Sequence, residues 1–153
     1  MDIEDLSNTI IETHIKMLPN KTLYPTALRF YSFCVDCLWV HSTGLQLTPA
    51  MYHKGVYAPN SEYYKANWDW KSVHGVSTTL SKIVNTEDGF EIIPFDISTI
   101  GEKVRRIVES VIEHFKDLDV FGLSLINQDW FGVDHVNQPI VNREMKSINV
   151  LGG

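Results

Sequence analysis

The sequence predicts one predominantly helical α+β domain over residues 1–153, with a buried central helix, a long helix in its C-terminal half and a small β-hairpin. Three observations support this fold class. The 153 residues are 44% hydrophobic, which is typical of a chain with a packed core rather than a disordered one. Apolar side chains recur at helical spacing in one segment near each end, and a segment between them is apolar on every side. Two short apolar runs around a polar loop account for the hairpin.

Residues 2–18 form the first predicted helix, because apolar residues recur in them at helical spacing, and Pro19-Asn20 ends it. The second predicted helix begins near Pro25, because proline is tolerated in a first turn, and ends at Gly44 as its C-terminal cap. Its apolar residues surround almost the whole circumference, so we expect it to be the buried centre of the fold. The apolar residues at helical spacing in the first helix are Ile3, Leu6, Ile10, Ile11, Ile15 and Leu18.

Two shorter elements are expected in the middle of the chain. Asn60 or Ser61 is suited to cap a short aromatic helix with the sequence SEYYKANWDWK. The run Asn85-Thr86-Glu87-Asp88-Gly89 lies between two apolar segments and predicts the turn of the β-hairpin.

The long helix is expected to follow a cap at Asp96 or Ser98 and to end near Lys116, because its apolar residues keep helical spacing throughout. A shorter helix is expected after Asp119. Residues 129–153 lose this periodicity, so we expect an irregular, loose C-terminal tail apart from one turn near Asn142 to Lys146.

Charge and composition exclude several classes of function. With 19 acidic and 13 basic residues the net charge is −6, so the chain lacks the excess of cations that neutralises nucleic-acid phosphates. It contains no apolar run of 18 residues, and its N-terminus, MDIEDLSNTIIETH, has no apolar signal segment. We therefore expect a cytoplasmic protein that binds neither nucleic acid nor membranes, with its two cysteines kept as thiols.

The stretch FCVDCLWVHSTG, residues 33–44, contains a candidate metal site. On a helix, Cys34, Cys37 and His41 would lie along one stripe, and His53 could supply a fourth ligand for tetrahedral Zn²⁺. Structural zinc sites normally hold a CxxC pair in a tight turn, however, and free cysteines commonly pack as small hydrophobic residues. A redox role would need a lowered thiol pKa, which a mid-helix position beside Asp36 does not favour. The core-helix interpretation is preferred, and no cofactor is expected.

No motif argues directly for catalysis. The chain has no glycine-rich phosphate loop, no GxSxG and no HExxH. His41-Ser42-Thr43 has the His-x-Thr spacing of two-histidine phosphodiesterases, but those enzymes need two copies and this chain offers one. No catalytic residue is assigned. A small phage or bacterial hydrolase acting on a nucleotide-type substrate, through His41, His53 or His74 with an acid, is kept as an alternative.

Aromatic residues are concentrated in YHKGVYAPNSEYYKANWDW, residues 52–70. Tyr and Trp in loops supply large contact areas at small entropic cost and are typical of protein-binding surfaces. Packing of some of these side chains on the core is the competing interpretation. The predicted partner-binding residues are Tyr52, Tyr57, Pro59, Tyr63, Tyr64, Trp68 and Trp70.

Three segments carry, in order, the pattern of a known family. They are Leu28-Arg29-Phe30-Tyr31 through Trp39 to Thr43-Gly44-Leu45, then Tyr52-His53-Lys54-Gly55-Val56-Tyr57-Ala58-Pro59 with Glu62-Tyr63-Tyr64, and last the long helix to Phe115 with Val120-Phe121-Gly122-Leu123-Ser124-Leu125 and Trp130. This order resembles the Panacea domain of antitoxins and phage-associated proteins, a family that includes SocA-like proteolytic adaptors. Two positions depart from the family pattern: Gly55 is followed by Val56 instead of proline, and Ile126-Asn127 replaces a threonine-histidine pair.

The resemblance implies a protein-interaction factor of the antitoxin or proteolytic-adaptor kind. Such a factor binds a toxin, protease or host factor and neutralises or redirects it. A second alternative to this interaction factor, beside the small hydrolase, stays open. It is an acidic inhibitor or structural protein of a phage, which acts by mimicking a charged partner.

Overall fold

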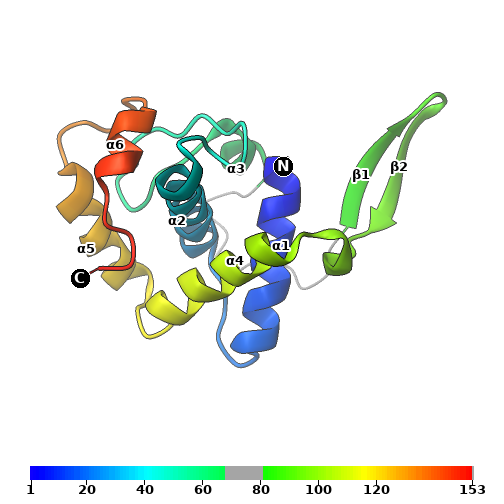
Figure 1. Ribbon diagram of the computed structural model, residues 1–153, viewed down its shortest axis with the longest axis horizontal. Helices are drawn as coiled ribbons and strands as arrows, with labels where there is room; N and C mark the ends of the chain where they lie inside the picture. The colour runs from blue at the N-terminus through cyan, green and yellow to red at the C-terminus, as the bar shows by residue number, and fades with distance from the viewer. Residues whose placement is uncertain (68–80, 153) are drawn as a thin grey trace.

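The computed structural model describes residues 1–67 and 81–152 and is predominantly helical, as predicted (Figure 1). Its elements are, in order, α1 (Ile3–Met17), α2 (Pro25–Thr43), α3 (Glu62–Asn67), β1 (Ser81–Thr86), β2 (Gly89–Pro94), a 3₁₀ turn (Ile97–Thr99), α4 (Glu102–Phe115), α5 (Val120–Phe131) and α6 (Asn142–Ser147). β1 and β2 pair antiparallel as a two-stranded ribbon that projects from the helices without forming a layer of the core (Figure 1). In the described part of the chain, no helix combines the length and apolar character needed to cross a membrane.

The predicted buried central helix is confirmed as α2. Pro25 occupies its first turn, and Gly44 ends it in the left-handed conformation, with φ 84° and its N–H bonded to the carbonyl of Val40. A glycine tolerates this backbone conformation without steric cost, which explains the stop. Four helices, α1, α4, α5 and α6, contact α2, so side chains on almost all of its faces are buried.

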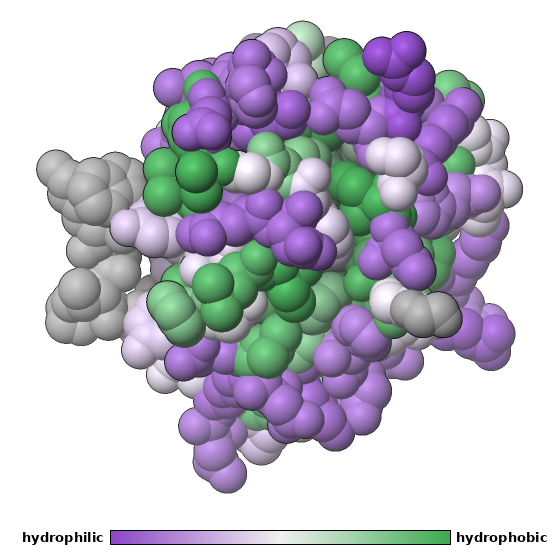
Figure 2. All heavy atoms as spheres, turned by 90° about the vertical axis from the view of Figure 1, so that its left-hand side faces the viewer, coloured by the Kyte–Doolittle hydropathy of each residue, from purple (hydrophilic) through white to green (hydrophobic). Residues whose placement is uncertain are grey.

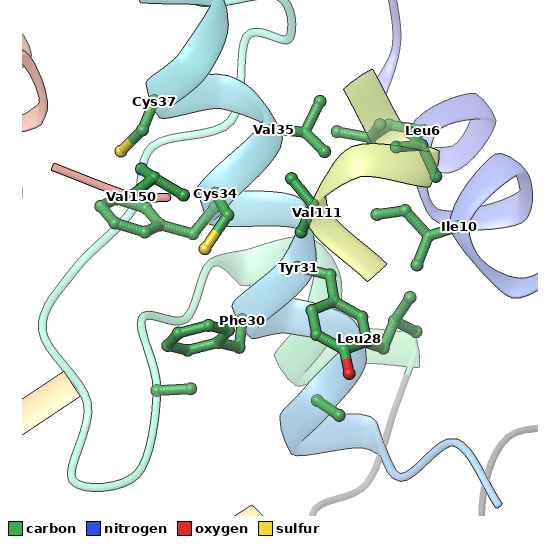
Figure 3. Packing of buried hydrophobic residues seen from close by; sticks show 14 of the residues in the cluster. Leu6, Ile10, Leu28, Phe30, Tyr31, Cys34, Val35, Cys37, Val111 and Val150 are labelled. Atoms are coloured by element: carbon green, nitrogen blue, oxygen red, sulfur yellow. The ribbon is translucent and has the colours of Figure 1, made fainter. Parts of the chain in front are cut away.

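Aromatic and aliphatic side chains from these helices form one core around α2. The Phe30 ring lies edge-on to Phe115, with 5.1 Å between ring centroids, and stacks on Trp130 at 5.4 Å. In Figure 3, Cys34 and Cys37 lie on the side of α2 near Val150. Both cysteines have 0% exposure, as expected of packing residues.

The helix starts in the second half of the chain agree only partly with the prediction. Asp96 caps the short 3₁₀ turn, where its carboxylate accepts the Ser98 N–H at 3.0 Å, and α4 begins later, after Gly101. Asp119 caps α5 through the N–H of Gly122 at 2.8 Å, in agreement with the helix predicted there. The prediction of α4 from a cap at Asp96 or Ser98 is wrong in its start, because a 3₁₀ turn uses the same Asx-type hydrogen bond as an α-helix.

The C-terminal segment is packed on the core, not loose as predicted. α5 continues to Phe131, and after an irregular stretch the turn predicted near Asn142 to Lys146 is confirmed as α6. The backbone N–H of Ile140 donates to the Tyr52 carbonyl at 2.9 Å, and the N–H of Lys54 donates to the Gln138 carbonyl at 2.8 Å. The prediction of a loose tail failed because the anchoring residues are single apolar side chains among polar neighbours, without a period that reveals burial. Those buried anchors are Ile140, Met145, Ile148 and Val150.

Candidate functional site

The aromatic residues predicted to bind a partner are mostly turned into the protein. Tyr52 and Tyr64 are each 2% exposed, and Pro59 is buried. Tyr63 is partly buried, whereas Tyr57 is 56% exposed. Among these five residues, Tyr57 is therefore the one whose ring a partner could reach directly. The other two predicted residues lie outside the described part of the chain: Trp68 and Trp70.

Tyr52 belongs to a buried polar network built on α2. Its hydroxyl donates to Oδ2 of Asp36 at 2.7 Å and lies 2.9 Å from the Ser32 hydroxyl. Thr48 donates to the same carboxyl from its N–H at 2.9 Å and from its hydroxyl at 2.7 Å. Burial raises the pKa of Asp36, and these hydrogen bonds oppose that rise. Because Asp36 has 0% exposure, the network serves to hold the loop after α2 rather than to meet a substrate.

The proposed zinc ligands do not come together. Burial raises the pKa of both thiols, Cys34 and Cys37. Nε2 of His41 lies 3.0 Å from the Met145 carbonyl. His53, in contrast, pairs through its backbone with Asn60 in the loop that follows it. Within residues 1–67 and 81–152, no three His, Cys, Asp or Glu side chains are grouped so that they could hold a metal ion.

The histidines of the hydrolase alternative are also separated. His53 lines a cavity together with Arg29, near the start of α2. His41 lies 12 residues after Arg29 on the same helix, which corresponds to about 18 Å at 1.5 Å per residue. His41 and His53 therefore face different parts of the protein, and His74 lies outside the described residues.

The candidate site is the cavity that contains His53, with a volume of about 550 Å³. It lies where the start of α2, the loop 53–60, α3, the start of α5 and residues 136–137 meet. Cavities of roughly 300–1,000 Å³ with apolar walls and a few polar groups are typical of ligand-binding sites. The lining residues are Thr26, Arg29, His53, Gly55, Val56, Tyr57, Asn60, Lys65, Val120, Val136 and Asn137.

The loop 53–60 is held closed by its own backbone and by α5. His53 and Asn60 exchange two backbone hydrogen bonds, at 2.9 and 3.0 Å. The amide nitrogen of Asn127, on α5, donates to the Gly55 carbonyl at 3.0 Å. A Cβ at Gly55 would lie 2.2 Å from the Ala58 carbonyl oxygen, so the loop needs glycine at this position. These contacts fix the wall of the cavity.

Arg29 is the most unusual member of the cavity lining. Its side chain comes from the buried helix α2, and the residue is only 8% exposed. Its Nε atom is buried without a hydrogen-bond partner, and burial lowers the pKa of Arg29 to about 10. At neutral pH the guanidinium is therefore still charged, although its surroundings disfavour the charge.

The other basic groups of the cavity are Lys65 and His53. Nζ of Lys65 lies 3.7 Å from Oε1 of Glu62, one turn away on α3. Burial, and next the charge of Lys65, lower the pKa of His53, whereas the charge of Glu62 acts in the opposite direction. No Asp or Glu is present among the described lining residues. The cavity is thus locally cationic in a chain whose net charge is −6.

Comparison with protein-family models, with curated proteins and with solved structures finds no match to this chain. The assignment of the site therefore depends on its geometry and chemistry.

Sequence reasoning identified part of this site and missed the rest. Tyr57 and His53 were singled out, but Arg29, Lys65 and the valines of the cavity were not. One signal was present in the sequence: Arg29 is a charged residue in the first half of a helix otherwise predicted to be buried. A charge at such a position needs either an ion-pair partner or a ligand.

Proposed function

We propose that the protein is a protein-interaction factor that binds its partner over the exposed apolar side of α5 and the adjoining loop 53–60. One observation carries this proposal. The α5 sequence, VFGLSLINQDWF, is predominantly apolar, and its apolar residues are not confined to one side, which is more typical of a buried helix than of a surface helix. Even so, Phe121 is 69% and Leu125 is 50% exposed.

The start of α5 meets the loop 53–60 at the cavity. Phe121 and Leu125 are separated by four positions, so they share one face of the helix. Val120, next to Phe121, lines the same cavity as Val56 and Tyr57, which are 51% and 56% exposed. Figure 2 shows the side of the molecule on which α5 and α6 lie, with patches of apolar residues between polar ones. Contiguous exposed apolar residues rimmed by polar ones are typical of interaction sites.

The resemblance to the Panacea domain supports the same class of function. In that family an antitoxin or proteolytic adaptor binds a toxin, protease or host factor and neutralises or redirects it. Compared with the sequence prediction, the proposed surface keeps Tyr57 and replaces the buried Tyr52 and Tyr64 by Phe121 and Leu125.

The test is co-purification from extracts of the source cells, with quantitative mass spectrometry. The bait proteins are the wild type, the double variant Phe121→Ser/Leu125→Ser, and the control Met51→Ser/Val141→Ser. The control also removes two exposed apolar side chains, because Met51 is 84% and Val141 is 49% exposed. Circular dichroism checks that all three proteins are folded.

We expect one protein to be recovered in stoichiometric amounts with the wild type and the control. Its binding to the double variant should be weaker by at least about tenfold, which corresponds to 1.4 kcal/mol for two central apolar contacts. Equal recovery with the double variant would contradict the proposed surface. Recovery of no stoichiometric partner with any bait would contradict the interaction function.

A further inference from the structure

Arg29 occupies a position that is costly for an unpaired charge. The residue is more than nine-tenths buried, and it lines the cavity between α2 and the loop 53–60. No ion pair or hydrogen bond to its guanidinium occurs in the described part of the chain, and its Nε atom is without a partner. A buried cation is normally paired with an anion, since an unpaired buried charge is strongly destabilising. The described part of the chain thus supplies no counter-ion for Arg29, and the anion of a bound ligand would supply one.

We propose that this cavity binds the carboxylate of a ligand whose neighbouring group is apolar, with Arg29 as the counter-ion. A guanidinium presents two parallel N–H groups that match the two oxygens of a carboxylate. This interaction would neutralise the charge for which residues 1–67 and 81–152 supply no anionic partner.

The charge balance of the cavity favours a singly charged group. Lys65 already faces Glu62, and the pKa of His53 is lowered from 6.5, so its imidazole is mostly neutral at pH 7. Among the described lining residues, Arg29 thus contributes one positive charge that no carboxylate compensates. A carboxylate carries one negative charge, whereas a phosphate monoester carries close to two near neutral pH. The carboxylate therefore leaves the site neutral, and the phosphate does not.

The walls of the cavity favour an apolar group beside the carboxylate. Val56, Val120 and Val136 contribute aliphatic surface, and Tyr57 contributes an aromatic ring at the edge. Thr26, in the first turn of α2, also lines the cavity. That helix start has no side-chain hydrogen-bonded cap and no acidic residue, so the positive end of the helix dipole is available to add to the attraction of an anion.

Two sources can supply this chemistry: a small apolar carboxylic acid, or the C-terminal carboxylate of a peptide that ends in an apolar residue. The inference does not depend on the proposed partner surface of α5. The site residues are Arg29, Thr26 and the valines of the cavity, and Phe121 and Leu125 do not line it.

The test is a titration of the folded protein followed by two-dimensional amide NMR. The probes are isovalerate, N-acetylglycyl-leucine, the uncharged amide of each, and methyl phosphate. We expect saturable shifts of resonances around the cavity with at least one of the two acids. Its amide should bind more weakly by at least about tenfold, because the charged interaction with Arg29 is lost. The comparison of the two acids distinguishes the small molecule from the peptide terminus.

Two arginine variants then test the role of the guanidinium. Arg29→Met keeps a long side chain without charge and should lose the preference for acid over amide. The control is Arg106→Met, since Arg106 is exposed on α4 and pairs with Glu102, away from the cavity; it should bind as the wild type does. The comparison of acid and amide in the wild type tests the proposal even if Arg29→Met does not fold.

Three results would overturn the proposal. They are equal binding of acid and amide, an unchanged acid preference in Arg29→Met, and the absence of saturable shifts with either acid. Tighter binding of methyl phosphate than of both acids would overturn the assignment of a carboxylate. The Phe121→Ser/Leu125→Ser variant should retain acid binding, so failure of the partner surface and failure of the carboxylate site give different results.

Discussion

Asp36 and Tyr52 show how single residues anchor the loop after the central helix. Asp36 lies on α2, and Thr48 and Tyr52 both follow that helix in the sequence. Three hydrogen bonds join their donors to the buried carboxyl group. In a buried site, a polar group that loses its partner is costly, so each of these donors supports the position of the whole loop.

The substitution Tyr52→Phe removes one of these donors and keeps the ring. We expect it to lower the free energy of unfolding by about 1–3 kcal/mol, because Asp36 and Ser32 lose a buried partner. Urea denaturation followed by circular dichroism measures the change. Tyr57→Phe is the matched control, because its ring is 56% exposed, and its effect should stay within about 0.5 kcal/mol. Equal effects of the two substitutions would argue against the buried network.

The pKa of Asp36 predicts a pH dependence with a definite sign. Burial raises this pKa above its ordinary value of 3.8 in the native state, so the native protein holds the proton at pH values where the unfolded chain has released it. Between the two pKa values, a rise in pH therefore favours unfolding. We expect the stability of the wild type relative to Asp36→Asn to fall as the pH rises from 3.8 toward the native pKa. The slope is at most about 1.4 kcal/mol per pH unit.

Urea denaturation of both proteins at closely spaced pH values measures this difference. The variant is the control for all other titrating groups, since it removes the Asp36 carboxyl group alone. A difference that grows with pH would show that hydrogen bonding outweighs burial at this site.

At the scale of elements, the loop 53–60 depends on a glycine for steric reasons. A Cβ at Gly55 would come within 2.2 Å of the Ala58 carbonyl oxygen, so Gly55→Ala should open the loop and cost about 1–3 kcal/mol. Hydrogen exchange of the His53 and Asn60 amides measures the opening, because their N–H groups close the loop. Gly101→Ala is the control: its Cβ would meet no atom within 4 Å. Loop amides that stay protected in Gly55→Ala would contradict the expected opening.

Helices that depend on local signals were predictable from the sequence. The ends of α2 follow from Pro25 and Gly44, whose backbone preferences act without help from the rest of the chain. α1 follows from a regular apolar period, and the predicted range 2–18 agrees with Ile3–Met17 to within one residue at each end. Elements whose ends are set by their own residues can be recognised in this way.

The candidate site and the C-terminal segment could not be predicted in the same way. Whether Tyr52, Tyr57 and Tyr64 are buried or exposed depends on which core positions the other elements fill, and their sequence neighbours do not determine this. The cavity likewise joins Arg29 to Val120 and Val136, which are distant along the chain. Such contacts arise from tertiary packing and leave no local pattern.

Met145 tests the packing of the C-terminal segment on α2. Its side chain has 0% exposure, and its carbonyl lies 3.0 Å from Nε2 of His41. We expect Met145→Ala to lower the free energy of unfolding by about 2–5 kcal/mol, because it removes buried apolar contacts and leaves a cavity. Met51→Ala is the control, since Met51 is 84% exposed and should have almost no effect. Thermal unfolding of both variants measures the two changes in stability. If the C-terminal segment were loose, Met145→Ala would destabilise the protein as little as Met51→Ala does.

At the scale of the whole molecule, the cavity links stability to binding. The chain carries a net charge of −6, yet Arg29 lies in the core helix without an anionic partner in the described part of the chain. For stability alone, an apolar residue would suit this buried position better than arginine. Binding sites, however, commonly retain groups that destabilise the ligand-free fold. The cost of the unpaired charge is then offset when an anion binds to the native state.

This link predicts that Arg29→Met is more stable than the wild type when no ligand is present. We expect the free energy of unfolding to rise by about 1 kcal/mol or more, because the variant no longer buries a cation that has no anionic partner among the described residues. Arg106→Met, which loses an exposed pair with Glu102, should change by less than about 0.5 kcal/mol. Addition of the acid that binds best, at 100 times its dissociation constant, should stabilise the wild type by about 2.7 kcal/mol and Arg29→Met far less. Urea denaturation of the three proteins with and without that acid measures both effects. A loss of stability in ligand-free Arg29→Met would show instead that Arg29 stabilises the fold.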